Sequence, residues 1–294
     1  MSNITGLEDI LDKNIINDIN NLVEIFRNDK NIELETRILG IDYGTYMYTL
    51  EQLIDEYEDI TVTEYLDVNI NLDNYDTLRI TFLDDIENVI SKLNCSKNEI
   101  MDYIVELFGS ENVEFMIKEN SKAIRHKIDE IGIVVKTVPE IIVDNIDKIK
   151  KIIPKKILFR KKTRTSIMIN KSVRCDITEI QTSGNINNLS KAIETYEIEL
   201  EATDHKIKSS DYMKSIELML LKIRKTEILI TKSEQNEVIS KYSELIEYDR
   251  KLSHLISRNV ISLERQHLHF IPNKYAVTDK PDGERCFLMC FDTG

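Results

Sequence analysis

The sequence predicts an α+β fold in which about eight strands close a β-barrel, with helical inserts and a helical and strand extension at the C-terminal end. The first observation is an alternation of apolar and polar residues with period two between residues 31 and 201, which is typical of strands with two different faces. The second is a change to period 3.6 between residues 209 and 257, which indicates helix. The third is length, since 294 residues of which 41% are hydrophobic can bury a core of this size.

Stretches with helical spacing separate the period-two segments, and several have Asp or Ser near their start, as expected for helix N-caps. The predicted strands span residues 31–39, 60–70, 75–83, 112–118, 131–138, 155–169, 173–181 and 194–203. The predicted helices span residues 10–27, 50–57, 84–93, 97–108 and 141–152. Residues 260–294 return to strand character. The expected domains are a barrel (1–207), a helical connector (208–257) and the start of a further domain (258–294).

Composition excludes several classes of protein. The 39 Lys and Arg against 52 Asp and Glu give a net charge of −13, which argues against a surface that binds duplex DNA or an anionic membrane. No apolar run approaches the roughly 18 residues of a spanning helix, and the N-terminus does not resemble a signal peptide, so we expect a cytoplasmic protein. The four cysteines form no CxxC pair, and phosphate-loop, GxGxxG, HExxH and GxSxG motifs are absent from the sequence.

Two predicted strands carry carboxylates at every second position. Glu33 and Glu35 share one face of the first strand, and Glu197, Glu199 and Glu201 share one face of the last. Carboxylates spaced about 7 Å apart on a strand repel and raise each other's pKa unless solvent or a cation relieves them. Hard divalent cations with oxygen ligands are suited to this role. The alternative is a solvated strand whose outer face is rich in Glu.

Basic residues follow the same period between the acidic strands. Residues 155–174 contain eight Lys or Arg and no acid. The alternative to a functional role is a basic edge strand whose charges prevent aggregation. Together, the acidic and basic strands indicate a barrel with a charged interior that can hold a metal on one wall and phosphates on the others. The residues concerned are Arg160, Lys162 and Arg164 on one face, Arg174, Asp176 and Thr178 on one face of the next strand, and Arg79 on an earlier strand.

The order of these motifs carries a resemblance. ExExR at 33–37, RxKxR at 160–164, RxDxT at 174–178 and ExExE at 197–201 together resemble the triphosphate tunnel metalloenzymes, specifically the metal-dependent RNA 5′-triphosphatases of fungal, poxvirus and giant-virus mRNA capping. The resemblance covers about residues 30–204. It implies an eight-stranded antiparallel barrel, and removal of the γ-phosphate from 5′-triphosphate RNA and from nucleoside triphosphates with Mg²⁺ or Mn²⁺. It also implies action in the host cytoplasm or a virus factory, or packaging in the virion.

The resemblance assigns roles to residues of this sequence. Glu197 is the candidate for orienting or deprotonating water, and Asp176 either shares that role or positions the basic side chains; the sequence does not separate the two. If the acidic strands lie on facing walls, they should share one cation. The metal-holding residues would be Glu33, Glu35, Glu199 and Glu201, and the phosphate-binding residues would be Arg37, Arg79, Arg160, Lys162, Arg164 and Arg174.

A second motif lies near the C-terminal end. The segment KxDGxR, from Lys280 to Arg285, resembles the nucleotidyl-lysine motif of mRNA guanylyltransferases and polynucleotide ligases, in which Lys280 would attack an α-phosphate. The alternative is an ordinary Asp-Gly hairpin turn. Nine residues follow Arg285, so we expect no guanylyl transfer by this chain and expect guanylyltransferase and methyltransferase modules downstream in a longer protein.

Three functions therefore remain open. The first is an RNA triphosphatase followed by the start of a guanylyltransferase. The second is a tunnel-fold phosphatase of inorganic tripolyphosphate, thiamine triphosphate or ATP, which needs no surface for RNA. The third is a non-enzymatic scaffold with solvated charged strands. The KxDGxR segment favours the first, because the fusion of these two activities serves cap synthesis.

Overall fold

The computed structural model describes residues 6–72, 75–150, 152–226 and 228–246. The chain divides into two compact units, Met1–Tyr242 and Ser243–Gly294. The first unit contains the barrel and the helix that follows it. The boundaries drawn from the sequence at residues 207 and 257 stay predictions, and the KxDGxR segment lies outside the described residues.

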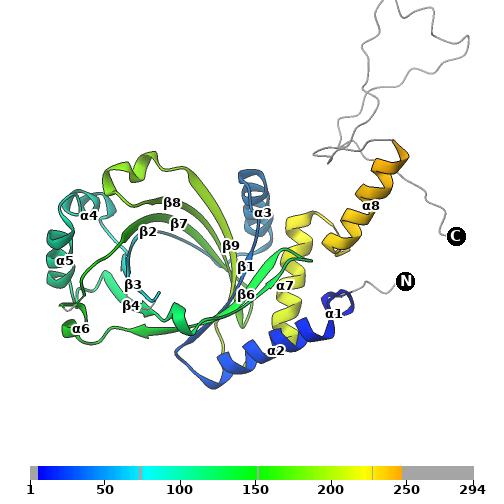
Figure 1. Cartoon of the computed structure of the whole chain (residues 1–294), viewed down its shortest axis with the longest axis horizontal. Helices are drawn as coiled ribbons and strands as arrows, with labels where there is room; N and C mark the ends of the chain where they lie inside the picture. Colours follow the sequence, from blue (N-terminus) through cyan, green and yellow to red (C-terminus); the bar gives the residue numbers. More distant parts are fainter. Residues whose placement is uncertain (1–5, 73–74, 151, 227, 247–294) are drawn as a thin grey trace, which may run out of the picture. The chain divides into compact units, whose positions relative to one another are not determined.

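An antiparallel β-barrel forms the centre of the first unit (Figure 1). Eight strands follow each other around it in the order β1-β9-β8-β7-β2-β3-β4-β6, and pairing of β6 with β1 closes the ring. The predicted eight-stranded antiparallel barrel is thus confirmed. The strands are β1 (Ile32–Ile38), β2 (Ile60–Asn71), β3 (Thr77–Phe82), β4 (Val113–Lys118), β5 (Ile124–Ile128), β6 (Ile133–Ile142), β7 (Ile157–Asn170), β8 (Val173–Ser183) and β9 (Glu194–Ala202).

Two details of the strand prediction were wrong. Strand β5 was missed because Arg125, His126 and Lys127 stand in succession and give no alternation; it pairs with β6 at the edge of the sheet. The helix predicted over residues 141–152 is much shorter, because Ile141 and Ile142 continue β6 and pair with β4. Only α6 (Ile146–Lys150) is helical there.

The other helices surround the barrel, and side-chain caps fix where two of them begin. Asp42 accepts a hydrogen bond from Thr45 N at 2.7 Å, so α3 begins a full two turns before the predicted residue 50. Ser96 and Glu99 form a capping box at the start of α5. The helices are α1 (Leu7–Ile10), α2 (Lys13–Asn28), α3 (Tyr43–Glu56), α4 (Ile86–Lys92), α5 (Lys97–Glu106), α7 (Ser209–Arg224) and α8 (Lys232–Leu245), with 3₁₀ turns η1 (Asn120–Lys122) and η2 (Ile186–Lys191).

The hydrophobic core lies outside the ring of strands rather than within it. Leu34 of β1 and Leu200 of β9 pack into one cluster with residues of α2, α3 and α7. Leu66 of β2 and Ile80 of β3 belong to a second cluster with residues of α4, α5 and α6, on the other side of the ring (Figure 1). Because neighbouring side chains on a strand point to opposite faces, burying these apolar residues outward turns the charged residues between them inward.

One buried hydrogen bond ties α7 to the barrel. The hydroxyl groups of Tyr212 and Thr36 lie 2.9 Å apart, and neither residue is exposed. We expect Tyr212→Phe to lower the free energy of unfolding by about 1 to 3 kcal/mol, because it leaves the Thr36 hydroxyl without this partner. Urea unfolding followed by circular dichroism measures the change. A loss within error of zero would contradict a structural role for this bond.

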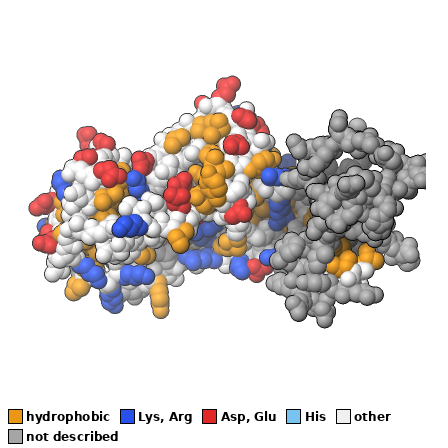
Figure 2. Space-filling model, turned by 90° about the horizontal axis from the view of Figure 1, so that it is seen from above, with side chains coloured by type: hydrophobic (Ala, Val, Ile, Leu, Met, Phe, Trp, Pro, Cys, Tyr) orange, Lys and Arg blue, Asp and Glu red, His pale blue; other side chains and the backbone are white. Residues whose placement is uncertain are grey.

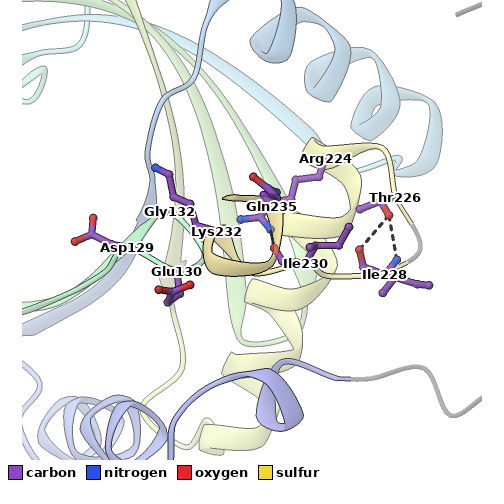
Figure 3. Close-up of a pocket in the computed structure, with 9 residues that line it drawn as sticks. All are labelled: Asp129, Glu130, Gly132, Arg224, Thr226, Ile228, Ile230, Lys232 and Gln235. Atoms are coloured by element: carbon purple, nitrogen blue, oxygen red, sulfur yellow. Dashed lines mark hydrogen bonds between the residues drawn. The ribbon is translucent and has the colours of Figure 1, made fainter. Parts of the chain in front are cut away.

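The helical segment predicted over residues 209–257 is interrupted after Arg224, where Lys225 takes a left-handed conformation (φ 54°). The Arg224 guanidinium donates hydrogen bonds to the carbonyl oxygens of Ile131 and Ile230 at 2.7 and 2.8 Å. A cavity of about 420 Å³ lies here, between the β5–β6 turn and the segment joining α7 to α8 (Figure 3). These contacts hold the start of α8 against the outside of the barrel.

No helix in the described part of the chain is long and apolar enough to cross a membrane. On the face of the molecule shown in Figure 2, acidic side chains lie mostly toward the upper edge and Lys and Arg side chains mostly along the lower part.

Candidate active site

A cavity of about 370 Å³ occupies the interior of the barrel. Eight Lys or Arg side chains and seven Asp or Glu side chains line it, so the interior is nearly balanced in charge when all are ionised. Every candidate site residue from the barrel strands lines this cavity except Asp176, which is hydrogen-bonded to Arg174. The candidate residues that line the cavity are Glu33, Glu35, Arg37, Arg79, Arg160, Lys162, Arg164, Arg174, Glu197, Glu199 and Glu201.

The acidic strands are neighbours on one wall. Strand β1 pairs with β9, so that Glu35 stands opposite Glu201 and Arg37 stands opposite Glu199. The two acidic strands therefore share one wall and do not face each other across the barrel. Side chains directly opposite on paired strands have Cβ atoms about 4.5 to 5.5 Å apart, so the carboxylates of the two strands still converge.

Basic side chains pair with most of these carboxylates. Lys118 lies 2.9 Å from Glu33, Lys136 lies 2.6 Å from Glu35, and the Arg37 guanidinium donates to Glu199 at 2.5 and 2.8 Å. In this arrangement, no three or more His, Cys, Asp or Glu side chains of the described residues are grouped closely enough to hold a metal ion. A cation at this wall would have to displace ammonium and guanidinium groups.

Burial and repulsion oppose the charge of two of these carboxylates. Burial raises the pKa of Glu35, and repulsion from Glu199 and Glu33 brings it to about 7 despite Lys136. Burial, with repulsion from Glu33 and Asp176, likewise raises the pKa of Glu201 to about 7 despite Arg174. Burial would also raise the pKa of Glu33, but Lys118 outweighs it and lowers that pKa to about 2. Burial and the neighbouring carboxylates thus disfavour the ionised forms of Glu35 and Glu201, although each has a cationic partner.

The raised pKa of Glu201 predicts that Glu201→Gln changes stability in a pH-dependent way. A carboxyl group whose pKa rises from about 4.5 to about 7 on folding favours the native state below pH 4.5, and this contribution is lost as the pH passes 7. With a chelator present, we expect Glu201→Gln to be more stable than the native chain at pH 8, by roughly 1 to 3 kcal/mol, and nearly equal to it at pH 4.5. Thermal unfolding at both pH values measures this. A variant less stable than the native chain at pH 8 would contradict the account.

Basic side chains cover much of the remaining wall. Lys162 lies 2.7 Å from Asp67, and burial lowers the pKa of this lysine to about 8 even with that partner. Both Lys162 and Arg164 lie over the Tyr65 ring, 5.4 Å from its centre. The buried Nε of Arg164 donates no hydrogen bond. A phosphate oxygen in the cavity would satisfy this donor.

The structure gives the two candidates for water activation different surroundings. Asp176 accepts hydrogen bonds from Arg174 at 2.8 and 2.9 Å and from Ser166 at 2.7 Å, and Arg164 lies 3.3 Å away. Asp176 is also 1% exposed. Glu197 lines the cavity, and its Oε1 atom alone receives Arg37 and Arg160, at 3.1 and 3.2 Å. Asp176 thus holds arginine side chains in position, whereas Glu197 faces the cavity, where a water could reach it.

Four charged residues of the cavity were missed in the sequence. Lys118, Lys136 and Glu140 line it from β4 and β6, and Asp67 lines it from β2. Each is a charged residue in an alternating strand, and Asp67 follows Thr63 and Tyr65 at period two. That alternation was available as a signal, but one or two charges per strand are common on solvated strands as well. Lys280, in contrast, lies outside the described residues.

Comparisons with known proteins extend these observations. The chain is 34% identical over 293 residues to a probable mRNA-capping enzyme of Acanthamoeba polyphaga mimivirus, a match that covers 95% of this chain and 25% of the relative. The chain thus spans about a quarter of that protein's length. A scan of protein-family models finds no match.

Solved structures match the barrel. The mimivirus capping enzyme triphosphatase superposes with a TM-score of 0.66 at 28% identity, covering 73% of this chain and 99% of the triphosphatase. A further structure of the RNA triphosphatase domain of a trifunctional mimivirus mRNA-capping enzyme gives the same TM-score and identity, and covers 98% of that domain. The fold and almost the full extent of that domain are therefore present here.

Proposed function

We propose that this chain, a homologue of the mimivirus mRNA-capping enzyme with the fold of its triphosphatase domain, removes the γ-phosphate from 5′-triphosphate RNA as a step of cap synthesis. The observation that carries the proposal is a closed barrel whose cavity combines clustered carboxylates with clustered Arg and Lys side chains. Nucleoside triphosphates present the same phosphate chain and are proposed as further substrates. In a longer protein, the expected partners are guanylyltransferase and methyltransferase modules.

The basic residues position the phosphate chain, one of the two things that γ-phosphate hydrolysis needs. The transition state is loose and carries its charge on the equatorial oxygens, so positioning and neutralisation dominate. Arg guanidinium groups bind phosphate in a planar, bidentate manner, whereas Lys acts as a point charge. We assign phosphate binding to Arg79, Arg160, Lys162, Arg164 and Arg174, with Asp176 holding the last two in place.

The acidic wall offers the type of donor that a hard divalent cation takes, and such an ion would replace Lys118, Lys136 and Arg37 as partners of these carboxylates. Its donors are carboxylate oxygens, the ligands that Mg²⁺ and Mn²⁺ take in proteins. Burial and nearby carboxylates raise the pKa values of Glu35 and Glu201, so a cation bound beside them would stabilise their charged forms. The eight cationic side chains of the cavity are already nearly balanced by seven acidic ones, which leaves little charge to neutralise a triphosphate. When bound, the ion would supply Lewis-acid neutralisation of the γ-phosphate. Its proposed ligands are Glu33, Glu35, Glu199 and Glu201.

Glu197 is the proposed group that orients the attacking water. Its carboxylate lines the cavity beside Arg37 and Arg160. A water that donates a hydrogen bond to this carboxylate would therefore lie near the phosphate-binding side chains. Arg37 contacts both Glu197 and Glu199 and thereby links the water-orienting group to the metal-holding wall. The role of Arg37 is therefore better described as positioning these carboxylates than as direct phosphate binding.

Hydrolysis of inorganic tripolyphosphate is the competing function, because the cavity recognises phosphate charge and contains no element that requires RNA. RNA labelled at the γ-phosphate separates the two when tripolyphosphate is added as competitor. With tripolyphosphate at the same concentration as the RNA, we expect the labelled phosphate to be released. The RNA should then carry 5′-diphosphate ends. If phosphate were released from tripolyphosphate alone and the RNA kept its 5′-triphosphate ends, the result would favour the competing function.

A further inference from the structure

A hollow of about 420 Å³ opens beside one mouth of the barrel, where β1 and β8 begin and β6 and β9 end. Its floor contains Glu33, Glu201 and Arg174, which also line the barrel cavity. The hollow therefore shares part of its wall with the proposed phosphate site. We call it the vestibule, and its outer part is formed by Phe26, Lys30, Ile142 and His205.

The outer part of the vestibule has a character different from the barrel interior. The His205 ring stacks on Phe26, with ring centres 4.1 Å apart and planes inclined by 20°. The Nδ1 atom of His205 lies 2.6 Å from the carbonyl oxygen of Phe26. A carbonyl oxygen can only accept, so the Nδ1–H group of His205 donates this hydrogen bond. The bond and the ring contact with Phe26 fix the orientation of the imidazole at the mouth.

An apolar side chain and a cation complete this rim. Ile142, at the end of β6, is 76% exposed although it stands in a strand. Lys30 is exposed in the segment between α2 and β1. An exposed apolar side chain, an imidazole ring held in place and a cation beside a phosphate site are features that can bind a nucleoside attached to phosphate, by stacking of the base on the ring and contact with the backbone.

We propose that the vestibule holds the first nucleoside of the substrate, with its base against His205 and Ile142 and its 5′ oxygen directed inward past Arg174. This assignment rests on the proposed function. The length of chain fits: from Glu199 in the middle of β9 to Thr203 at the mouth is four residues, or about 13 Å of strand, which is the scale of a triphosphate and its ribose. Arg174 lines both the cavity and the vestibule and so lies where the phosphate chain would pass.

The vestibule would thus distinguish nucleotides from inorganic tripolyphosphate. The barrel cavity would serve both substrates equally, since it contacts phosphate alone. Only a nucleotide would gain from the stacking surface. Its loss should therefore appear in KM for nucleotides and in the ratio of kcat/KM for GTP to kcat/KM for tripolyphosphate.

The test compares these two substrates in His205→Ala and Ile142→Ala. We expect His205→Ala to lower the GTP to tripolyphosphate ratio by roughly 5- to 100-fold, the range that loss of one ring stacked on a base gives. We expect Ile142→Ala to lower the same ratio, by a smaller factor, because it removes an apolar contact and no ring. Ile142 is exposed, so its variant keeps the test valid even if His205→Ala unfolds. Ile193→Ala is the matched control, because Ile193 is 88% exposed and does not line the vestibule; its ratio should equal that of the native chain.

Two results would overturn the proposal: an unchanged ratio in Ile142→Ala and in folded His205→Ala, or a fall of equal size for both substrates. Failure of the proposed function would look different, because the native chain itself would then release no phosphate from GTP or triphosphate RNA, whether or not it hydrolyses tripolyphosphate. An equal ratio change in the Ile193→Ala control would also count against the vestibule, since it would show that any exposed isoleucine has this effect.

Discussion

Glu199→Gln is expected to reduce kcat for γ-phosphate release by roughly 10²- to 10³-fold, the loss typical of removing one preorganised charged contact from an active site. Glu199 is buried, pairs with Arg37 and stands on the same wall as Glu35, so an amide there removes charge from the proposed cation site and releases a guanidinium. Steady-state phosphate release from triphosphate RNA measures kcat.

Glu194→Gln is the matched control for this variant. Glu194 begins the same strand but its side chain is exposed and does not line the cavity. Its kcat should match that of the native chain, and both variants should give the native far-ultraviolet circular dichroism spectrum. Full activity in folded Glu199→Gln would show that the Glu199 carboxylate has no role in the reaction.

Arg164→Lys should lower kcat/KM by roughly 10²-fold, although it keeps the positive charge. The Arg164 guanidinium lies over Tyr65, contacts Asp176 and has an Nε donor without a hydrogen bond. A lysine supplies one ammonium group and cannot present two parallel donors to a phosphate. The measurement is kcat/KM with triphosphate RNA.

The outer face of the same strand offers the control. Lys161 pairs with Glu64 and Glu87 outside the cavity, so Lys161→Arg should leave kcat/KM unchanged. Equal activity of Arg164→Lys and the native chain would show that Arg164 makes no bidentate contact with the phosphate, and would leave its role as a partner of Asp176.

The inward direction of the charged residues could be predicted from the sequence because it follows from alternation within a single strand. Glu33 and Glu35 alternate with Leu34, and once Leu34 is buried outward the carboxylates must face inward. The same reasoning placed Arg160, Lys162 and Arg164. These predictions needed no knowledge of which strands are neighbours.

Features that depend on pairing between strands could not be predicted in this way. The partners of Glu33 and Glu35, Lys118 and Lys136, come from strands far along the chain, and their positions follow from the register of β6 against β1 and β4. The same holds for β1 and β9, which are neighbours on one wall. His205 lies in a loop after β9 and gives no periodic signal, so only the structure shows it stacked on Phe26.

The most direct test of the central claim is phosphate release by the native chain from RNA labelled at the γ-phosphate, with Mn²⁺ or Mg²⁺ and with a chelator in excess. The account predicts release with either metal, 5′-diphosphate RNA as the other product, and loss of release on chelation that added metal restores. Folded protein that releases no phosphate with either metal would contradict the assignment of the barrel cavity as a triphosphatase site. Undiminished release in the chelator would contradict the metal role of the acidic wall.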